Sequence, residues 1–136
     1  MTNVAEQPIS LNIVLAVPFE EALTRVTEAL KTEGFGVLTT IDVQATMQAK
    51  LNVEFAPYTI LGACNPQLAY TALQGNPSAG LLLPCNVVAR QTADGVLIEI
   101  ANPSALLTVI QDQTMEAVAQ AAREKLERVA ALLRAK

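Results

Sequence analysis

The sequence predicts an α+β domain: a two-layer α/β sandwich with a largely antiparallel five-stranded sheet, helices on one face and a long C-terminal helix. Three observations predict it. Short apolar segments rich in β-branched residues mix with helical patterns without strict βα alternation, which favours antiparallel pairing. Asp94-Gly95 joins two such segments and is a strong hairpin signal. The last stretch carries a long apolar stripe at helical spacing.

Five segments are expected to form strands because each is short, apolar and bounded by Gly, Pro, Asn or Asp. They are Ser10–Val17, Gly36–Ile41, Tyr58–Cys64, Leu83–Arg90 and Val96–Ala101. A two-residue loop at Asp94-Gly95 sets Arg90 directly opposite Glu99, where the two side chains can form a solvated surface pair of small energetic weight.

Helix starts follow a repeated pattern. Pro18 opens a helix that ends at Gly34 in a left-handed conformation. An Asn that caps a helix and a Pro at its first position recur three times, at Asn65-Pro66, Asn76-Pro77 and Asn102-Pro103. The helix from Asn65-Pro66 is expected to stop near Gly75.

The C-terminal helix is expected from about Gln113 to Ala135. Its apolar stripe alternates by four and three residues, so it can pack on a sheet or on a partner helix, and the domain's own sheet is the preferred interpretation. The stripe comprises Met115, Ala119, Ala122, Leu126, Val129 and Leu133.

Asp42 is expected to cap a short helix that carries Val43, Met47 and Leu51 on one stripe. Asp42 and Lys50 stand apart from other charges. Their simplest roles are a helix cap and a solvated helix end, and both are also candidate ligand-binding residues.

A chain of 136 residues is most simply a single domain, here with a loose lead-in over residues 1–9. The composition is 51% hydrophobic and only 16% charged, so a substantial core is available. Because a small domain has much surface to cover, some apolar surface is expected to remain exposed. A homodimer is the expected outcome.

Charge and composition exclude several classes of function. The net charge of −4 and the thinly spread basic residues argue against nucleic acid and anionic membranes as partners. No secretory signal or apolar run of about 20 residues is present, so a cytoplasmic protein with free thiols is expected. The lack of histidine excludes Ser-His-Asp and Cys-His catalysis and imidazole metal ligands.

The centre of the chain carries no charge. The thirty-five residues from 55 to 89 contain no Asp, Glu, Lys or Arg. One interpretation is that they supply the inner strands and a covering helix, since charged residues are rarely buried. The other is that part stays on the surface as a subunit contact or apolar pocket, with Phe55–Tyr58 and Ser78–Leu83 the segments expected to be exposed.

Both cysteines lie in this window, as the repeated pair Cys64-Asn65 and Cys85-Asn86. Cys64 is expected to end a strand just before a helix, where the helix dipole acidifies thiols. If neighbouring strands bring the sulfurs together, they can form a redox pair or a soft two-thiolate metal site. Alternatively, each cysteine fills a small apolar slot, Asn65 is a cap and Asn86 bonds nearby backbone.

These residues carry a resemblance to a known family that runs from about Ile13 to Leu107. The matching segments are Glu20-Glu21-Ala22, Gly34-Phe35-Gly36, Ile41-Asp42-Val43, Lys50, Leu61–Pro66, Ala69-Tyr70 and Gly80–Val87. In them the sequence resembles the domain-of-unknown-function 302 family. The resemblance implies a small α+β fold, commonly dimeric, and supplies no reaction.

Three functions stay open. The preferred one is a homodimeric module that binds a small molecule or soft metal ion around Cys64, Asn65, Cys85 and Asn86. The second is a structural or interaction protein without a ligand. The third is a thiol-dependent enzyme with Cys64 as nucleophile and Cys85 as the resolving thiol, a pair that comprises the candidate catalytic residues and the candidate metal ligands.

Overall fold

Five strands form one antiparallel sheet in a computed structural model that describes residues 8–135. The order across the sheet is β1-β5-β4-β3-β2, so the first two strands of the chain lie at opposite edges. The strands are β1 (Ser10–Leu15), β2 (Gly36–Asp42), β3 (Tyr58–Cys64), β4 (Cys85–Thr92) and β5 (Gly95–Ala101). The predicted α+β sandwich is confirmed. Of the predicted lead-in, residues 1–7 fall outside the described range.

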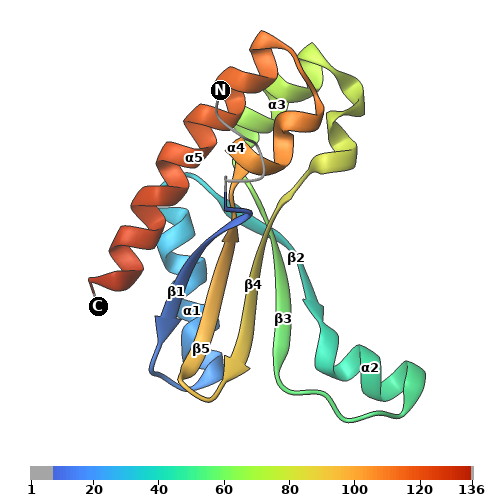
Figure 1. Cartoon of the computed structure of the whole chain (residues 1–136), viewed down its shortest axis with the longest axis vertical. Helices are drawn as coiled ribbons and strands as arrows, with labels where there is room; N and C mark the ends of the chain where they lie inside the picture. The colour runs from blue at the N-terminus through green and yellow to red at the C-terminus, as the bar shows by residue number, and fades with distance from the viewer. Residues whose placement is uncertain (1–7, 136) are drawn as a thin grey trace.

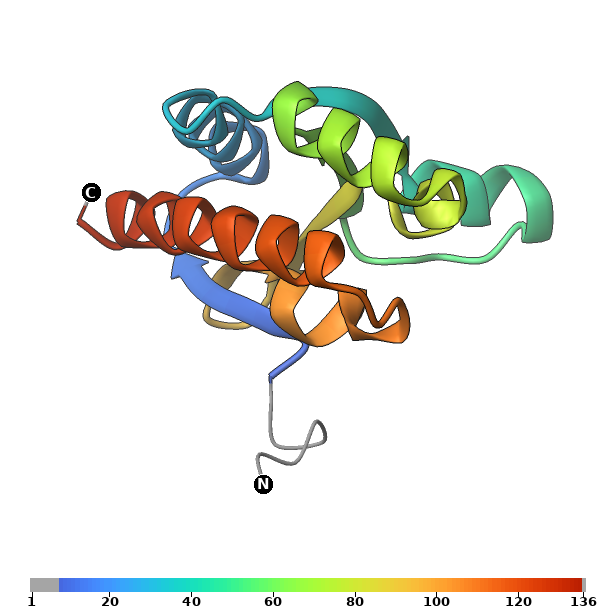
Figure 2. The same ribbon diagram turned by 90° about the horizontal axis from the view of Figure 1, so that it is seen from above.

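Two helices cover one face of the sheet (Figures 1 and 2). α1 (Phe19–Lys31) follows β1, and α5 (Gln113–Arg134) lies beside α1 across the same face. All six residues of the predicted α5 stripe are buried, which confirms that this helix packs on its own domain. The sheet contributes alternate residues to this core, among them Ile13, Val87 and Ile98.

A second hydrophobic cluster lies beyond one end of the sheet, where several short elements gather (Figure 1). They are α3 (Pro66–Gly75), the 3₁₀ helix η2 (Pro77–Leu82), α4 (Pro103–Leu106) and the 3₁₀ helix η3 (Leu107–Val109). The first turns of α5 close this cluster, and Met115 is its largest fully buried side chain. The molecule therefore has two cores that share α5.

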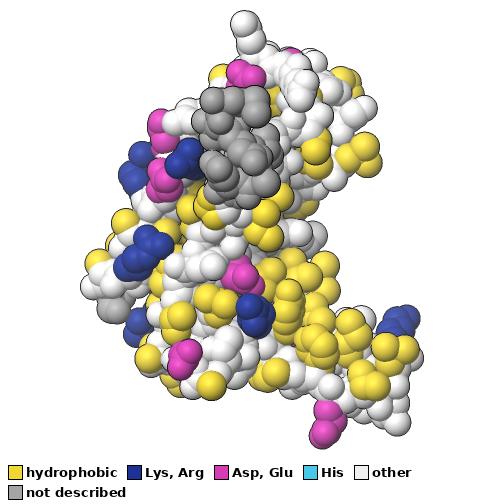
Figure 3. All heavy atoms as spheres, viewed as in Figure 1, with side chains coloured by type: hydrophobic (Ala, Val, Ile, Leu, Met, Phe, Trp, Pro, Cys, Tyr) yellow, Lys and Arg dark blue, Asp and Glu magenta, His cyan; other side chains and the backbone are white. Residues whose placement is uncertain are grey.

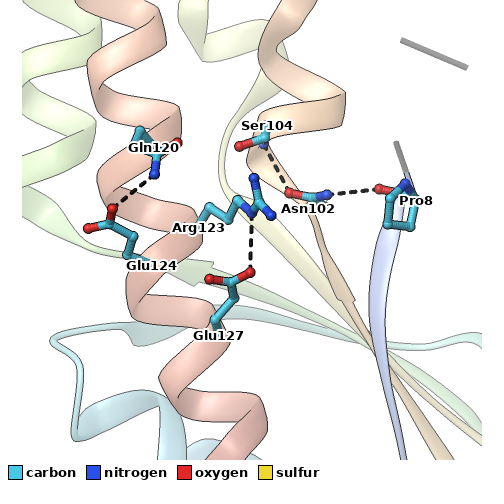
Figure 4. Close-up of polar contacts among 7 residues, drawn as sticks. All are labelled: Pro8, Asn102, Ser104, Gln120, Arg123, Glu124 and Glu127. Carbon is cyan, nitrogen blue, oxygen red and sulfur yellow. Dashed lines mark hydrogen bonds and ion pairs between the residues drawn. The ribbon is translucent and has the colours of Figure 1, made fainter. Parts of the chain in front are cut away.

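The three predicted Asn-Pro helix starts are confirmed. Asn65, Asn76 and Asn102 each accept a hydrogen bond at the side chain from a backbone N–H in the first turn of the helix that follows. Asn102 is 1% exposed and also donates from Nδ2 to the Pro8 carbonyl at 2.9 Å (Figure 4). It thus ties the start of the described chain to α4.

The outer face of α5 is polar. Gln120 contacts Glu124, and Arg123 pairs with Glu127 at 3.2 Å, both at a spacing of four residues (Figure 4). Arg128 reaches across to Glu33 in the turn that follows α1. This polarity is consistent with α5 turning its apolar stripe inward.

The β4–β5 hairpin corrects one prediction. The loop is Ala93-Asp94 rather than Asp94-Gly95, because Thr92 pairs with Gly95. The Thr92 hydroxyl donates to the Gly95 carbonyl and accepts from the Asp94 N–H, which closes the turn one residue earlier. Arg90 therefore lies opposite Leu97 and not opposite Glu99; the two charged side chains still meet diagonally, at 2.9 Å.

Several strand boundaries and one segment also differ from expectation. β1 ends at Leu15 rather than Val17, and β4 begins at Cys85 rather than Leu83. Pro84 has no N–H for the ladder, so β4 starts after it. The segment Ser78–Leu83, which was expected to be exposed, is mostly the 3₁₀ helix η2; its Leu81 is exposed and its Ala79 is buried.

The chain between β2 and β3 projects from the sheet (Figure 1). It contains α2 (Val43–Leu51), which Asp42 caps by accepting from the Ala45 N–H, as predicted. The predicted stripe of α2 is not packed into the core, and α2 buries no residue. Within residues 8–135, no helix combines the length and the apolarity that a membrane crossing requires.

Candidate functional site

The two cysteines lie next to each other across neighbouring strands. Cys64 ends β3 and Cys85 begins β4, and the antiparallel register pairs Cys85 with Ala63. Both are free thiols of intermediate exposure, and both line one small cavity of about 20 Å³. Such a volume holds about one water-sized guest. We call this cavity the thiol cavity.

The thiol cavity lies where the two hydrophobic clusters meet. Phe35 and Ala63 belong to the cluster under the sheet, and Leu107 and Val118 to the cluster beyond it. The remaining lining residues apart from the cysteines are Asn65, Leu68, Ala69, Leu83, Pro84 and Ala122. Because the walls are almost wholly apolar, the two sulfurs are the principal groups here that can bind a ligand.

Gly62 explains why the segment before β4 can approach β3 so closely. A Cβ atom at this position would lie 2.8 Å from the Pro84 side chain and would also collide with Thr39. Glycine therefore lets Pro84 sit against β3 immediately before Cys85. Gly62 thus helps to bring Cys85 close to Cys64.

Asn65 uses both ends of its amide in the fold. Its oxygen accepts from the Leu68 N–H at 3.2 Å, and its nitrogen donates to the Glu33 carbonyl at 3.3 Å. It caps α3 directly after Cys64 and fixes the turn that leads into β2. Cys64 therefore lies at the positive end of the α3 dipole.

Burial and, as the smaller cause, the neighbouring Cys64 together raise the pKa of the Cys85 thiol from 9.0 to about 11. Burial acts in this way because it disfavours the charged thiolate. Cys85 is therefore protonated at neutral pH, and a metal ion or electrophile that binds its sulfur must displace that proton.

A wider groove of about 320 Å³ adjoins the thiol cavity. It shares Leu83, Pro84, Cys85 and Leu107 with that cavity, and the exposed Asn86 lies on its rim. Its volume reaches the lower end of the range for small-molecule sites. Cys85 therefore lines both the thiol cavity and this wider groove.

The structure brings together Cys64, Asn65 and Cys85, and it places Asn86 beside them. Asp42 and Lys50 are at the two ends of α2 in the projecting segment, and neither lines the thiol cavity. Among residues 8–135, no cluster of three or more Cys, Asp or Glu is arranged to hold a metal ion. A metal site at this place must depend on the two sulfurs.

Sequence reasoning missed part of the apolar lining. Ala122 was expected on the buried stripe of α5, but nothing in its spacing indicates that this stripe passes the cysteines. Leu107 carries no local signal at all, since a short irregular segment positions it. Leu68 and Ala69, in the first turn of α3, follow from the helix that Asn65 starts, and Ala63, Leu83 and Pro84 directly precede the cysteines in the sequence.

The fold and the thiol cavity define a small α+β domain with a pair of free thiols between its sheet and its helices. The chain belongs to the DUF302 family, described as a domain of unknown function, whose sequence profile matches residues 11–133. This confirms the family resemblance. No match to the sequence was found among curated proteins.

A solved relative has the same fold. The crystal structure of an uncharacterized conserved protein DUF302 from Bacillus stearothermophilus is similar to this chain at a TM-score of 0.82 and 30% sequence identity. The similarity covers 90% of this chain and 96% of that one. The two proteins therefore share the fold over nearly their full lengths.

Proposed function

We propose that this protein is a homodimeric binding module that holds one soft metal ion, Cu(I), between Cys64 and Cys85. The observation that carries the proposal is the thiol cavity, a space for a single small guest that the free cysteines Cys64 and Cys85 both line. Thiolate sulfur is the ligand that soft ions prefer.

The number of ligands selects the ion. Structural zinc needs four protein ligands, and iron–sulfur clusters need about four cysteines. The cavity offers two sulfurs and no carboxylate in its lining. Cu(I) accepts as few as two sulfur ligands, so it is the ion that this donor set satisfies.

The surroundings support a charged complex in an apolar site. Two thiolates and one Cu(I) carry a net negative charge, and the N-terminus of the ten-residue helix α3 follows Cys64 directly. On binding, the S–H bond of each cysteine breaks, the two protons pass to solvent, and a Cu–S bond forms to each sulfur. No electron is transferred. The apolar walls limit the contact of the ion with water and oxidants.

Copper binding is tested by titrating the reduced, untagged protein with Cu(I) against a chromophoric chelator without oxygen. We expect one Cu(I) per chain, and at least about tenfold weaker binding in Cys64→Ser and in Cys85→Ser because each loses one of two ligands. Thr71→Ser, on the exposed side of α3, is the matched control and should bind as the parent does. Equal affinity in the double variant Cys64→Ser, Cys85→Ser would overturn the proposal.

The affinity should also depend on pH. Because Cys85 keeps its proton up to a pKa of about 11, Cu(I) must displace that proton at neutral pH. Binding should strengthen as the pH rises from 6 to 8, by up to about tenfold per unit for this proton. The same titration at several pH values, corrected for the chelator's own protonation, measures the slope.

The groove beside Cys85 supports a second candidate, a small apolar ligand. Its walls are Leu81–Asn86 together with residues near α4, and Leu81 at its rim is 88% exposed. An apolar fluorescent probe such as 1-anilinonaphthalene-8-sulfonate should bind the native protein, and Leu81→Ser should weaken it. Unchanged probe binding in Leu81→Ser would remove this candidate and leave the copper site untouched.

A further inference from the structure

Among the residues that the structure describes, no helix covers the face of the sheet that turns away from α1 and α5 (Figure 2). Because side chains alternate along each strand, the residues between the buried positions point to this side. The register aligns them in two rows, Val14–Leu97–Arg90–Tyr58 and Asn12–Glu99–Val88–Ile60–Ile41. We call these residues the open sheet face.

The open sheet face is largely apolar. Val14 and Ile41, at its two edges, are 51% and 48% exposed. Two charged side chains interrupt it, Arg90 and Glu99, and they pair with each other at 2.9 Å. In the space-filling view, hydrophobic side chains gather over the sheet and continue onto the projecting segment (Figure 3).

The projecting segment, residues 43–57, extends this apolar surface. Its helix α2 has nine residues and buries none of them, although isolated helices shorter than about 12 residues are marginal in water. Leu51 is 66% exposed. Phe55 contacts Tyr58 of the open sheet face edge to face, with ring centroids 5.9 Å apart, so the two surfaces are continuous.

We propose that the open sheet face and residues 43–57 form the interface with a second copy of this chain, sheet packed on sheet about a two-fold axis. The projecting segment of each copy then lies against its partner and gains the packing that α2 lacks. The inference rests on the homodimer of the proposed function and does not use its thiol site.

Charge favours a second copy over other partners. The face carries one positive and one negative side chain, so it is neutral and complementary to itself. After a two-fold rotation, Arg90 of one copy can meet Glu99 of the other. An acidic partner or a nucleic acid would instead need clustered basic residues, and the two rows contain a single Arg.

The size of the surface also fits. Five strands spaced about 4.8 Å apart, with about six residues rising about 3.4 Å each, span on the order of 500 Å² before side-chain relief is counted. The projecting segment adds to this area. Together they approach the roughly 800 Å² per partner that a stable dimer buries.

Sedimentation velocity of the full chain over a range of concentrations tests the interface. The parent should sediment as a dimer of the 14.4 kDa chain. Val14→Glu and Ile41→Glu should each raise the dissociation constant by more than about tenfold, because each brings an unpaired charge into the contact. Both sites are about half exposed, so the fold should survive, as circular dichroism verifies.

Val109→Glu is the matched control, since Val109 is 72% exposed in η3 and lies outside the open sheet face. It should dimerise as the parent does. A parent that remains a monomer at every concentration, or a dimer broken by Val109→Glu but not by the two face variants, overturns the inference. The double variant Cys64→Ser, Cys85→Ser should still dimerise, and Val14→Glu should still bind Cu(I). Failure of the dimer interface is therefore distinguishable from failure of the copper site.

Discussion

At the scale of single residues, the protonated Cys85 thiol makes the stability depend on pH. Its pKa is about 11 in the folded protein against an ordinary value of 9.0. In the unfolded chain the thiol loses its proton first, so the native state binds more protons between these two values. The free energy of unfolding should therefore fall as the pH rises from 9 to 11, by roughly 2 to 3 kcal/mol from this group.

Urea unfolding under reducing conditions at pH 8, 9.5 and 10.5 measures this fall. Cys85→Ser should lose this part of the pH dependence, while other groups that titrate in the range contribute equally to both proteins. Cys64→Ser should keep most of it, because burial is the larger cause and the neighbouring thiol the smaller one. Parallel curves for the parent and Cys85→Ser would contradict this account of the thiol cavity.

At the scale of elements, two Asn-Pro helix starts differ in the number of hydrogen bonds that the Asn side chain makes. Asn76 caps η2 alone, whereas the buried Asn102 caps α4 and also binds the Pro8 carbonyl. Asn76→Ala should lower the free energy of unfolding by about 1 kcal/mol, and Asn102→Ala by about 2 kcal/mol or more. Urea titration of the two variants compares them; equal losses would mean that the bond to Pro8 adds nothing.

Some helices and strands were predicted correctly from the sequence and others were not. Caps and helix stripes are local signals, so Asn65, Asp42 and the α5 stripe were placed correctly. The hairpin register was not, because the Thr92 side chain closes the turn in a way that the Asp94-Gly95 pair does not indicate. The exposure of α2 was not predicted either, because Val43, Met47 and Leu51 have the spacing of a helix that packs on a core.

The site was predictable only in part. Local patterns predict that Cys64 ends one strand and that Cys85 lies near the start of the next, but they leave open whether these two strands are neighbours, which the sheet order shows. Their common cavity depends on Leu107 and Val118, which lie far along the chain and come together through the second cluster. Such a meeting of distant segments has no signature in a single sequence.

At the scale of the whole molecule, the thiol cavity and the open sheet face are separate. The cavity lies between the two hydrophobic clusters on the helical side, and the open face points away from the helices. A dimer of the proposed kind therefore leaves both thiol cavities uncovered by the partner's sheet. Each copy should bind its own ion, without cooperation between the two.

Native mass spectrometry of the reduced protein after supplementation with Cu(I) tests the central claim most directly. The account predicts a species of two chains with two copper ions, and two chains without copper for Cys64→Ser, Cys85→Ser. Chains that remain free of copper under the same conditions would contradict it.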